Sequence, residues 1–208
     1  MPASLHPGLY AITDEALATG HALSKQVAHA LQGGAKVIQY RDKSDDQKKR
    51  RREATELLQL CKNYQVPLII NDDIALAADI GADGVHLGKE DSQLTEARTT
   101  LGDQAIIGIS CYNNLELAQT AEARGASYVA FGRFFPSQSK PHATHADLTT
   151  LRKAKEVIDI PIVAIGGITP ENGGELVAAG ADMLAVIHAV FGQPDITAAC
   201  QRFNSLFD

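Results

Sequence analysis

The chain has few cysteines, and none are spaced as a pair. Cys61, Cys111 and Cys200 are odd in number and far apart, which argues against a disulfide framework and against a zinc site. The chain also lacks an apolar run of signal-peptide length near its start and any later run that approaches a membrane span. These absences predict reduced thiols in a soluble, cytoplasmic protein that does not bind membranes.

Positive charge is also scarce. The 19 Lys and Arg residues are outnumbered by 25 Asp and Glu residues, for a net charge of -6. This balance argues against general nucleic-acid binding, although local cations can still hold small anions. The one basic run, residues 48–52, begins a predicted amphipathic helix, so we interpret it as a solvated outer face. The expected ligands are small molecules.

Short apolar runs alternate with segments of helical periodicity along the whole chain. A chain of 208 residues without a linker or low-complexity tract predicts a single domain over residues 1–208. Alternation of this kind predicts βα units and a parallel sheet, and eight units favour one closed (β/α)8 TIM barrel. The predicted strands are residues 9–13, 36–41, 68–71, 84–87, 105–110, 128–132, 162–166 and 183–188. The clearest predicted helices are residues 23–32, 48–64, 115–123 and 171–179.

Four Gly-Ala pairs stand just before predicted strands. The glycines are Gly34, Gly81, Gly125 and Gly180. Glycine suits the left-handed conformation that ends many helices, so each pair predicts the end of a helix.

Polar residues follow the apolar runs, most clearly at the second predicted strand. Gln39, Arg41 and Lys43 stand at alternate positions there. Residues two apart in a strand share one face, so the pattern predicts an amide and two cations pointing the same way. We interpret this face as an anion site. Other strand-like runs end at Asn71-Asp72-Asp73, Ser110 and Gly166-Gly167, or lead toward Glu90-Asp91.

An ordered set of motifs along nearly the whole chain resembles the thiamine phosphate synthase family. The matching residues are Gln39-Tyr40-Arg41-Asp42-Lys43, Asn71-Asp72, Val85-His86-Leu87-Gly88 with Glu90-Asp91, Gly108-Ile109-Ser110, Pro136-Ser137-Gln138-Ser139-Lys140, and Ile165-Gly166-Gly167-Ile168. The resemblance implies a (β/α)8 barrel enzyme that joins a pyrimidine diphosphate to a thiazole phosphate.

The resemblance also implies roles for the strand-end residues. Arg41, Lys43, Ser110 and Lys140 would be catalytic, and the three cations would neutralise the departing diphosphate. Gln39 and Ser110 would orient the pyrimidine or the reacting groups. The implied substrate-binding set is Gln39, Arg41, Lys43, Asn71, Ser110, Ser137, Ser139, Lys140, Gly167, Ile187 and His188.

Asp72 and Asp91 match the family's metal ligands and imply a Mg²⁺ cofactor. Mg²⁺ prefers carboxylate, water and phosphate oxygens. Either aspartate could instead cap the helix that follows it, which is a common role for Asp. Asp73 could compete for the metal, but it would face the opposite way if the strand continued, so we favour Asp72.

The long polar stretch at residues 134–146 follows the sixth predicted strand. Its serines Ser137 and Ser139 stand where the family often has threonine, and with Lys140 they could close over a diphosphate and exclude water. A mobile polar loop is the ordinary reading of such a composition. We assign no role to His142 or His145.

Two positions depart from the family pattern. His188 follows Ile187 where a serine is common, so it could hold a phosphate or narrow the pocket. Arg133 stands where a proline is common.

Thr169-Pro170 is typical of a helix start, with Thr169 as N-cap. His86 is read as a packed, hydrogen-bonded core histidine rather than a catalyst.

The sequence therefore predicts a Mg²⁺-dependent transferase. It would condense 4-amino-2-methyl-5-pyrimidinylmethyl diphosphate with thiazole phosphate, or its carboxylate, by a dissociative substitution. Diphosphate would be released. The alternatives are a related thiazole tautomerase, which handles only the thiazole half, and a non-catalytic barrel that binds thiamine precursors. The sequence leaves open a homo-oligomer and the preference between the two thiazoles.

Overall fold

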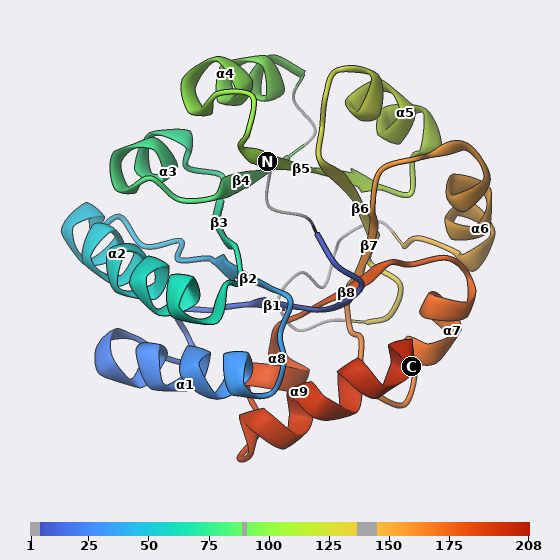
Figure 1. The fold of residues 1–208 in the computed structure, drawn as a ribbon. Helices are drawn as coiled ribbons and strands as arrows, with labels where there is room; N and C mark the ends of the chain where they lie inside the picture. The colour runs from blue at the N-terminus through green and yellow to red at the C-terminus, as the bar shows by residue number, and fades with distance from the viewer. Residues whose placement is uncertain (1–4, 89–90, 137–144) are drawn as a thin grey trace.

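The computed structural model describes residues 5–88, 91–136 and 145–208, with the backbone alone at positions 91 and 92. Eight strands in this part of the chain form a closed, parallel barrel in the order β1 to β8. They lie in a ring surrounded by helices (Figure 1). The strands are β1 (Gly8–Ile12), β2 (Val37–Tyr40), β3 (Leu68–Asn71), β4 (Gly84–Leu87), β5 (Ile106–Tyr112), β6 (Tyr128–Gly132), β7 (Ile162–Ile165) and β8 (Met183–Val186). The predicted TIM barrel is confirmed.

Helices follow the strands and cover the outside of the barrel (Figure 1). They are α1 (Gly20–Gln32), α2 (Gln47–Tyr64), α3 (Ile74–Ile80), α4 (Asp91–Leu101), α5 (Leu115–Ala123), α6 (Leu148–Val157), α7 (Gly173–Ala178), α8 (His188–Phe191) and α9 (Ile196–Asn204), followed by the 3-10 turn η1 (Ser205–Phe207). In the described residues, none of these helices is long and apolar enough to cross a membrane.

The four predicted helix-ending glycines all have positive φ. Their φ angles are +89° at Gly34, +67° at Gly81, +86° at Gly125 and +110° at Gly180. These values lie in the region that glycine enters without steric cost. The helix ends expected there are confirmed.

Two hydrophobic clusters follow from the alternation of side chains along each strand. The larger one packs between the sheet and the helices. The smaller one fills the barrel interior and consists of Tyr10, Ile12, Val37, Ile69, Ile106, Tyr128, Ala130, Val163, Met183 and Ala185. On β2, Val37 and Gln39 face inward, whereas Ile38 and Tyr40 belong to the outer layer. The predicted alternation of Gln39 with its neighbours is therefore present in the fold.

Gly108 makes room for an aromatic side chain inside the barrel. A Cβ atom at Gly108 would lie 1.9 Å from Cζ of Tyr128, which is fully buried. Only a residue without a side chain allows the phenol ring to occupy this space.

Several element boundaries differ from the sequence prediction by one to three residues, and three of these differences affect predicted site or cap residues. β2 ends at Tyr40 and β8 at Val186, so Arg41 lies in a loop and His188 begins α8. The predicted N-cap role of Thr169 is wrong, because α7 begins at Gly173 after Asn172. The Asn172 side chain accepts a hydrogen bond from Thr169 N at 2.8 Å, and Gly173 N donates to Thr169 O at 2.9 Å. These bonds close a turn that delays the helix.

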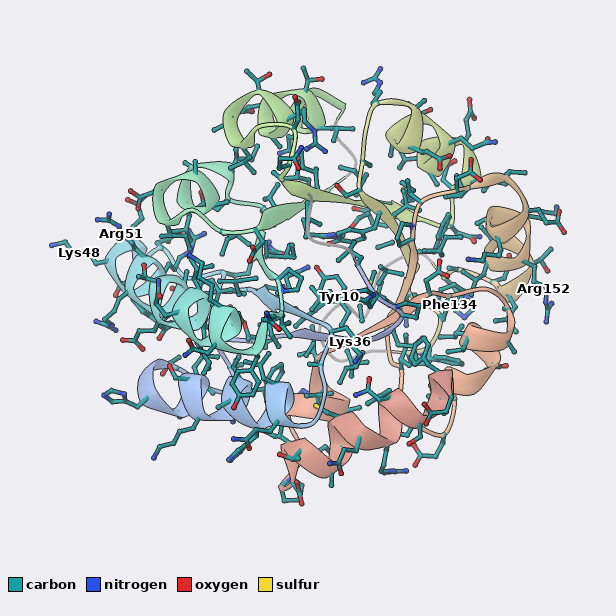
Figure 2. The ribbon with its side chains drawn as sticks, in the orientation of Figure 1. Tyr10, Lys36, Lys48, Arg51, Phe134 and Arg152 are labelled. Carbon is teal, nitrogen blue, oxygen red and sulfur yellow. The ribbon has the colours of Figure 1, made fainter. Side chains whose placement is uncertain are left out.

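The basic run at the start of α2 is only partly a solvated face. Lys48 is exposed and points away from the barrel (Figure 2). Lys49 and Arg50 are instead half-buried, and they pair with Asp42 at 2.6 Å and Asp73 at 2.7 Å. The expectation of solvation fails for these two residues, because the acids that follow β2 and β3 lie against the helix.

The three cysteines are buried and free of disulfides, as expected from their spacing. Burial raises the pKa of each thiol to about 12.

Candidate active site

A cavity of about 550 Å³ lies among the carboxyl ends of the strands. Ligands bind at this end of (β/α)8 barrels. The predicted site residues that the structure describes with their side chains all line this cavity, namely Gln39, Arg41, Lys43, Asn71, Asp72, Ser110, Gly167, Ile187 and His188. The fold thus brings together residues that are separated by up to about 150 positions in the sequence.

Four predicted site residues cannot be placed in the same way. Ser137, Ser139 and Lys140 lie outside the described residues. Asp91 is the first residue of α4, and its side chain is likewise outside the described part.

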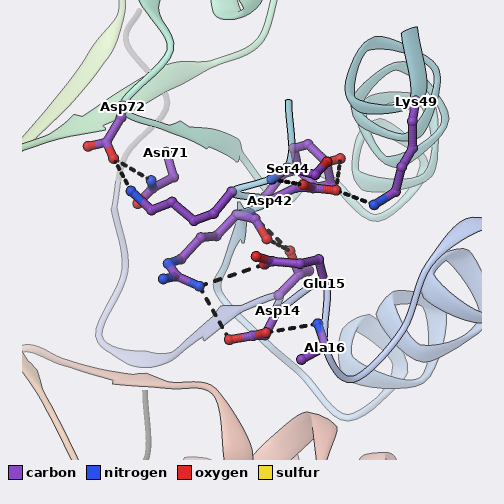
Figure 3. A network of polar contacts seen from close by, with 12 residues as sticks. Asp14, Glu15, Ala16, Asp42, Ser44, Lys49, Asn71 and Asp72 are labelled. Atoms are coloured by element: carbon purple, nitrogen blue, oxygen red, sulfur yellow. Dashed lines mark hydrogen bonds and ion pairs between the residues drawn. The ribbon is translucent and has the colours of Figure 1, made fainter. Parts of the chain in front are cut away.

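The two cations that follow β2 are held by carboxylates (Figure 3). Arg41 Nη1 lies 3.2 Å from Asp14 Oδ2 and 3.8 Å from Glu15 Oε2, and its side chain is 15% exposed. Lys43 Nζ lies 2.8 Å from Asp72 Oδ2, and its side chain is 51% exposed. Arg41 is therefore a fixed cation, while the more exposed Lys43 has room to turn toward a ligand.

Asp14 and Glu15 are residues that the sequence analysis missed. They follow β1 and Thr13 in the sequence. Like the acids after β3, they lie at the carboxyl end of a strand. A hydrogen bond between a side chain and the backbone also joins the two loops, because Thr13 Oγ1 accepts from Arg41 N at 3.0 Å. Attention to the polar residues after the first strand would have found this pair.

Asp72 has the chemistry of a magnesium ligand. Its Oδ2 atom accepts hydrogen bonds from Lys43 Nζ and Asn71 Nδ2, both at 2.8 Å. Its Oδ1 atom has no partner among the described residues, and the side chain is 52% exposed. Three acids, histidines or cysteines do not converge on one point anywhere in the described residues. Mg²⁺ does not need such a group, because one or two carboxylates with water and substrate phosphates suffice. The donors present therefore fit the ion.

Asp73 has a structural task instead. Its Oδ1 atom accepts a hydrogen bond from Leu76 N at 2.8 Å, which caps α3, and its Oδ2 atom pairs with Arg50 Nη2 at 2.7 Å. Both oxygens are thus engaged in holding α3 and α2 near the cavity.

A second cavity of about 520 Å³ adjoins the first and shares Lys43, Asn71 and Asp72 with it. Its lining is polar and includes Asp45 and Glu96. Lys43 and Asp72 thus lie where an inner cavity meets an acid-rich groove.

Gly167 also lines the cavity, from the turn after β7. Its φ is +64°, and a Cβ atom there would lie 2.3 Å from Pro136 O. Phe135 N donates to Gly166 O at 3.0 Å, so the segment that follows β6 packs against the turn. His188 is exposed and lines the cavity beside the turn residues. Backbone groups of the turn and the His188 imidazole thus line the same part of the cavity.

The inner end of the cavity carries hydrogen-bonded side chains from the strands. His86 was expected to be a hydrogen-bonded core residue, and its ring lies 2.8 Å from Tyr128 OH and 2.9 Å from Ser110 Oγ. His86 is nevertheless only partly buried and lines the cavity, as Tyr10 and Tyr128 also do. The two tyrosines were not predicted, because nothing local in the sequence marks which strand residues face inward at the same level.

A family model described as thiamine monophosphate synthase matches residues 9–190. A thiamine-phosphate synthase from Nitrosococcus oceani is 55% identical over 200 residues, which cover 96% of this chain and 92% of the relative. A second one, from Methylococcus capsulatus, is 52% identical over 96% of this chain and 89% of the relative.

Two solved structures are also similar to this chain. A thiamine phosphate pyrophosphorylase from Pyrococcus furiosus superposes with a TM-score of 0.86 and 37% identity, covering 96% of this chain and 94% of that one. A 3-hexulose-6-phosphate synthase, at 18% identity and a TM-score of 0.66, shares the fold alone.

Proposed function

Because the chain belongs to the thiamine monophosphate synthase family and is therefore a transferase, we propose that it joins 4-amino-2-methyl-5-pyrimidinylmethyl diphosphate to thiazole phosphate. The bond between the pyrimidinylmethyl carbon and the diphosphate oxygen breaks, and a bond from that carbon to the thiazole nitrogen forms. Thiamine phosphate and diphosphate are the products. The carboxylated thiazole phosphate is a second acceptor of the same class.

The single observation that carries this proposal is that two groups of residues able to donate to phosphate line one cavity. Arg41 and Lys43 follow β2, while Gly167 and His188 follow β7 and β8. Two substrates that each bear phosphate need two such groups, with their reacting atoms between them. Gln39 and Ser110 line the space between and would orient the pyrimidine.

The substitution is proposed to be dissociative. The aminopyrimidine ring stabilises positive charge on its methylene carbon as the diphosphate leaves, so no protein nucleophile is needed. Arg41, which is held in a fixed position, stabilises the negative charge that develops on the departing diphosphate. The more exposed Lys43 can move with the diphosphate as it leaves. Lys140, with Ser137 and Ser139, is proposed to add donors to the diphosphate and exclude water.

Asp72 and Asp91 are the proposed ligands of Mg²⁺, which when bound would neutralise further charge on the diphosphate. The support is the half-exposed Asp72 carboxylate, which pairs with Lys43 through one oxygen while its other oxygen has no partner in the part of the chain that the structure describes. The protein is proposed to act in the cytoplasm.

The test is diphosphate release by the purified protein with both substrates, with Mg²⁺ and after chelation. We expect release only when both substrates and the ion are present. Turnover of a thiazole alone would instead support the tautomerase, and binding without release would support a carrier.

The metal assignment has its own variants. Asp72→Asn and Asp91→Asn should each raise the Mg²⁺ concentration needed for half-maximal rate far more than they lower Tm. Asp103→Asn is the matched control, because Asp103 is exposed and lies outside both cavities. Unchanged Mg²⁺ dependence in both site variants would refute the assignment.

A further inference from the structure

Five cavity-lining side chains form one continuous chain of hydrogen bonds across the inside of the barrel. Gln39 Nε2 donates to Tyr10 OH at 2.8 Å, and Tyr10 OH lies 2.7 Å from Tyr128 OH. Tyr128 OH lies 2.8 Å from His86 Nδ1, and His86 Nε2 lies 2.9 Å from Ser110 Oγ. The five residues come from β2, β1, β6, β4 and β5. The chain therefore links Gln39 and Ser110, the two residues assigned to orient the substrate.

Packing holds the middle of this chain in place. Tyr10 is 1% exposed and Tyr128 is fully buried. The two phenol rings meet edge to face at 5.8 Å, and the Tyr128 ring stacks on the His86 ring at 5.5 Å. Gly108 leaves the space that the Tyr128 ring fills. These rings have little freedom to change partners.

Both phenol hydroxyls keep their protons at neutral pH. Burial raises the pKa of Tyr10 and of Tyr128 well above the ordinary tyrosine value. Each tyrosine therefore contributes one proton to the chain and can also accept a hydrogen bond.

The proton positions follow from the end at Gln39. Tyr10 accepts from the Gln39 amide, so its own proton goes to Tyr128, because a buried donor left without an acceptor is costly. Tyr128 in turn donates to Nδ1 of His86, which then carries its proton on Nε2. His86 Nε2 donates to Ser110 Oγ, and the Ser110 proton remains for the cavity.

We propose that Tyr10, Tyr128 and His86 are positioning residues that fix the hydrogen-bonding direction at both ends of this chain. Gln39 Oε1, which has no partner among the described residues, then presents an acceptor to the ligand. The Ser110 hydroxyl presents a donor. The two ends are coupled, because reversing one end requires every proton between them to move.

This direction selects the chemistry of the ligand, and here the inference rests on the proposed function. An aminopyrimidine offers an amine donor and ring-nitrogen acceptors, which complement Gln39 Oε1 and the Ser110 hydroxyl. A pyrimidine with an oxo group in place of the amine offers a carbonyl acceptor and a ring N–H donor, which is the reverse arrangement. The chain of hydrogen bonds thus makes the site specific for the amino form of the pyrimidine.

The first experiment needs no substrate. In protein carrying isotope-labelled histidine, the ring-nitrogen chemical shifts at neutral pH report which nitrogen of His86 bears the proton, and loss of the signals in His86→Asn assigns them. We expect a neutral ring with the proton on Nε2. A proton on Nδ1 would overturn the proposed direction, whatever reaction the protein catalyses.

The second experiment measures specificity. We expect the wild-type protein to favour the amino over the oxo pyrimidine diphosphate by ~10²-fold or more in kcat/KM, since a site built around hydrogen bonds rejects a mismatched partner. Tyr128→Phe breaks the chain and should lower this preference by ~10-fold or more. In the same variant, the ring-nitrogen chemical shifts should show a mixture of the two neutral tautomers of His86. Tyr10→Phe is a second variant that breaks the chain at another link.

Tyr40→Phe is the matched control. Tyr40 is also a buried tyrosine on the sheet, but its hydroxyl donates to Glu53 outside the barrel at 2.9 Å. This variant should lose some thermal stability and keep both the preference and the His86 tautomer. An unchanged preference in Tyr128→Phe and Tyr10→Phe would overturn the positioning role. A fixed tautomer without turnover of either pyrimidine would instead refute the proposed function and leave the chain intact.

Discussion

The two sides of the chain around the end of β2 differ in how fully their polar groups are used. On the cavity side, Gln39, Arg41 and Lys43 line the 550 Å³ cavity, and Lys43 is half-exposed. On the helix side, Tyr40 and Asp42 are at least nine-tenths buried. Successive residues of one short segment therefore serve two different purposes.

The helix side is a closed network. Tyr40 OH donates to Glu53 Oε2 at 2.9 Å, and Gly20 N donates to Glu53 Oε1 at 2.7 Å. Asp42 accepts from Lys49 Nζ at 2.6 Å and from Ser44 N at 2.7 Å. Figure 3 shows the Lys49 side chain reaching Asp42 from α2. This side ties β2 to α1 and α2, whereas the cavity side keeps charges available for a ligand.

The largest effect should come from Lys43→Ala, on the cavity side. We expect kcat/KM to fall by ~10²-fold or more, because one charged group that stabilises the leaving diphosphate is lost. Tm should change little, since an exposed ion pair contributes at most about 1 kcal/mol. Steady-state kinetics and thermal unfolding measure the two quantities. Lys48→Ala, which removes an outward-pointing lysine on α2 (Figure 2), is the control and should change neither. A near-normal kcat/KM in Lys43→Ala would contradict the division of roles.

Glu53→Ala should have the opposite pattern. It leaves the Gly20 N–H without its partner and the Tyr40 hydroxyl with only the longer bond to Asp42 Oδ2 at 3.4 Å, and we expect the free energy of unfolding to fall by about 2–3 kcal/mol. The folded variant should keep kcat within about twofold, because Glu53 lies outside the cavity. Urea denaturation gives the stability. Glu56→Ala, on the exposed face of the same helix, should cost at most about 0.5 kcal/mol. Equal losses in the two variants would show that the buried network adds nothing.

His188→Ala sharpens the comparison at the part of the cavity lining that includes Gly167. If the imidazole of His188 donates a hydrogen bond to the thiazole phosphate, removing the ring should weaken affinity for that substrate severalfold, because the donor is lost. Affinity for the pyrimidine diphosphate should be nearly unchanged. Binding measurements with each substrate decide the matter, and an unchanged affinity for the thiazole phosphate would mean that His188 does not contact the phosphate.

The smallest effect concerns Asp42 and appears only in acid. Burial raises the pKa of its carboxyl, but hydrogen bonds from Lys49 and Ser44 outweigh burial and hold the pKa below its usual value. A lowered folded pKa means that the stabilisation is present above the unfolded pKa of about 3.9 and is lost as pH falls through the folded pKa. The stability difference between wild type and Asp42→Asn should therefore shrink as pH falls below about 4. Denaturation at several pH values tests this, and a stability difference that stays constant across this range would contradict it.

Periodicity alone predicted most of the fold. The runs at residues 68–71, 84–87 and 128–132 match β3, β4 and β6 at both ends. These strands end where polar residues or glycine interrupt a β-branched or aromatic run, and such interruptions are visible in the sequence. The start of α7 was predicted less well, because the Asn172 side chain and the Thr169 backbone compete with the expected cap.

The site was predictable to the extent that it is local. Alternation places Gln39, Arg41 and Lys43 on one side, and family motifs identify Asp72, Ser110 and Gly167. The partners of these residues were not predictable. Arg41 pairs with Asp14, which is 27 positions away in the sequence. Tyr10 shares a hydrogen bond with Tyr128, which is 118 positions away.

The sequence by itself determined the barrel, the strand ends to within about two residues and the identities of the groups that stand there. Hydrophobic period, glycine at positive φ and the polar residue after each apolar run are properties of neighbouring residues. Only the tertiary structure decided which cation meets which carboxylate and which hydroxyl passes its proton to which acceptor. The reason is that closing the barrel sets the level of every inward-facing side chain, and that level depends on the register of strands distant in sequence.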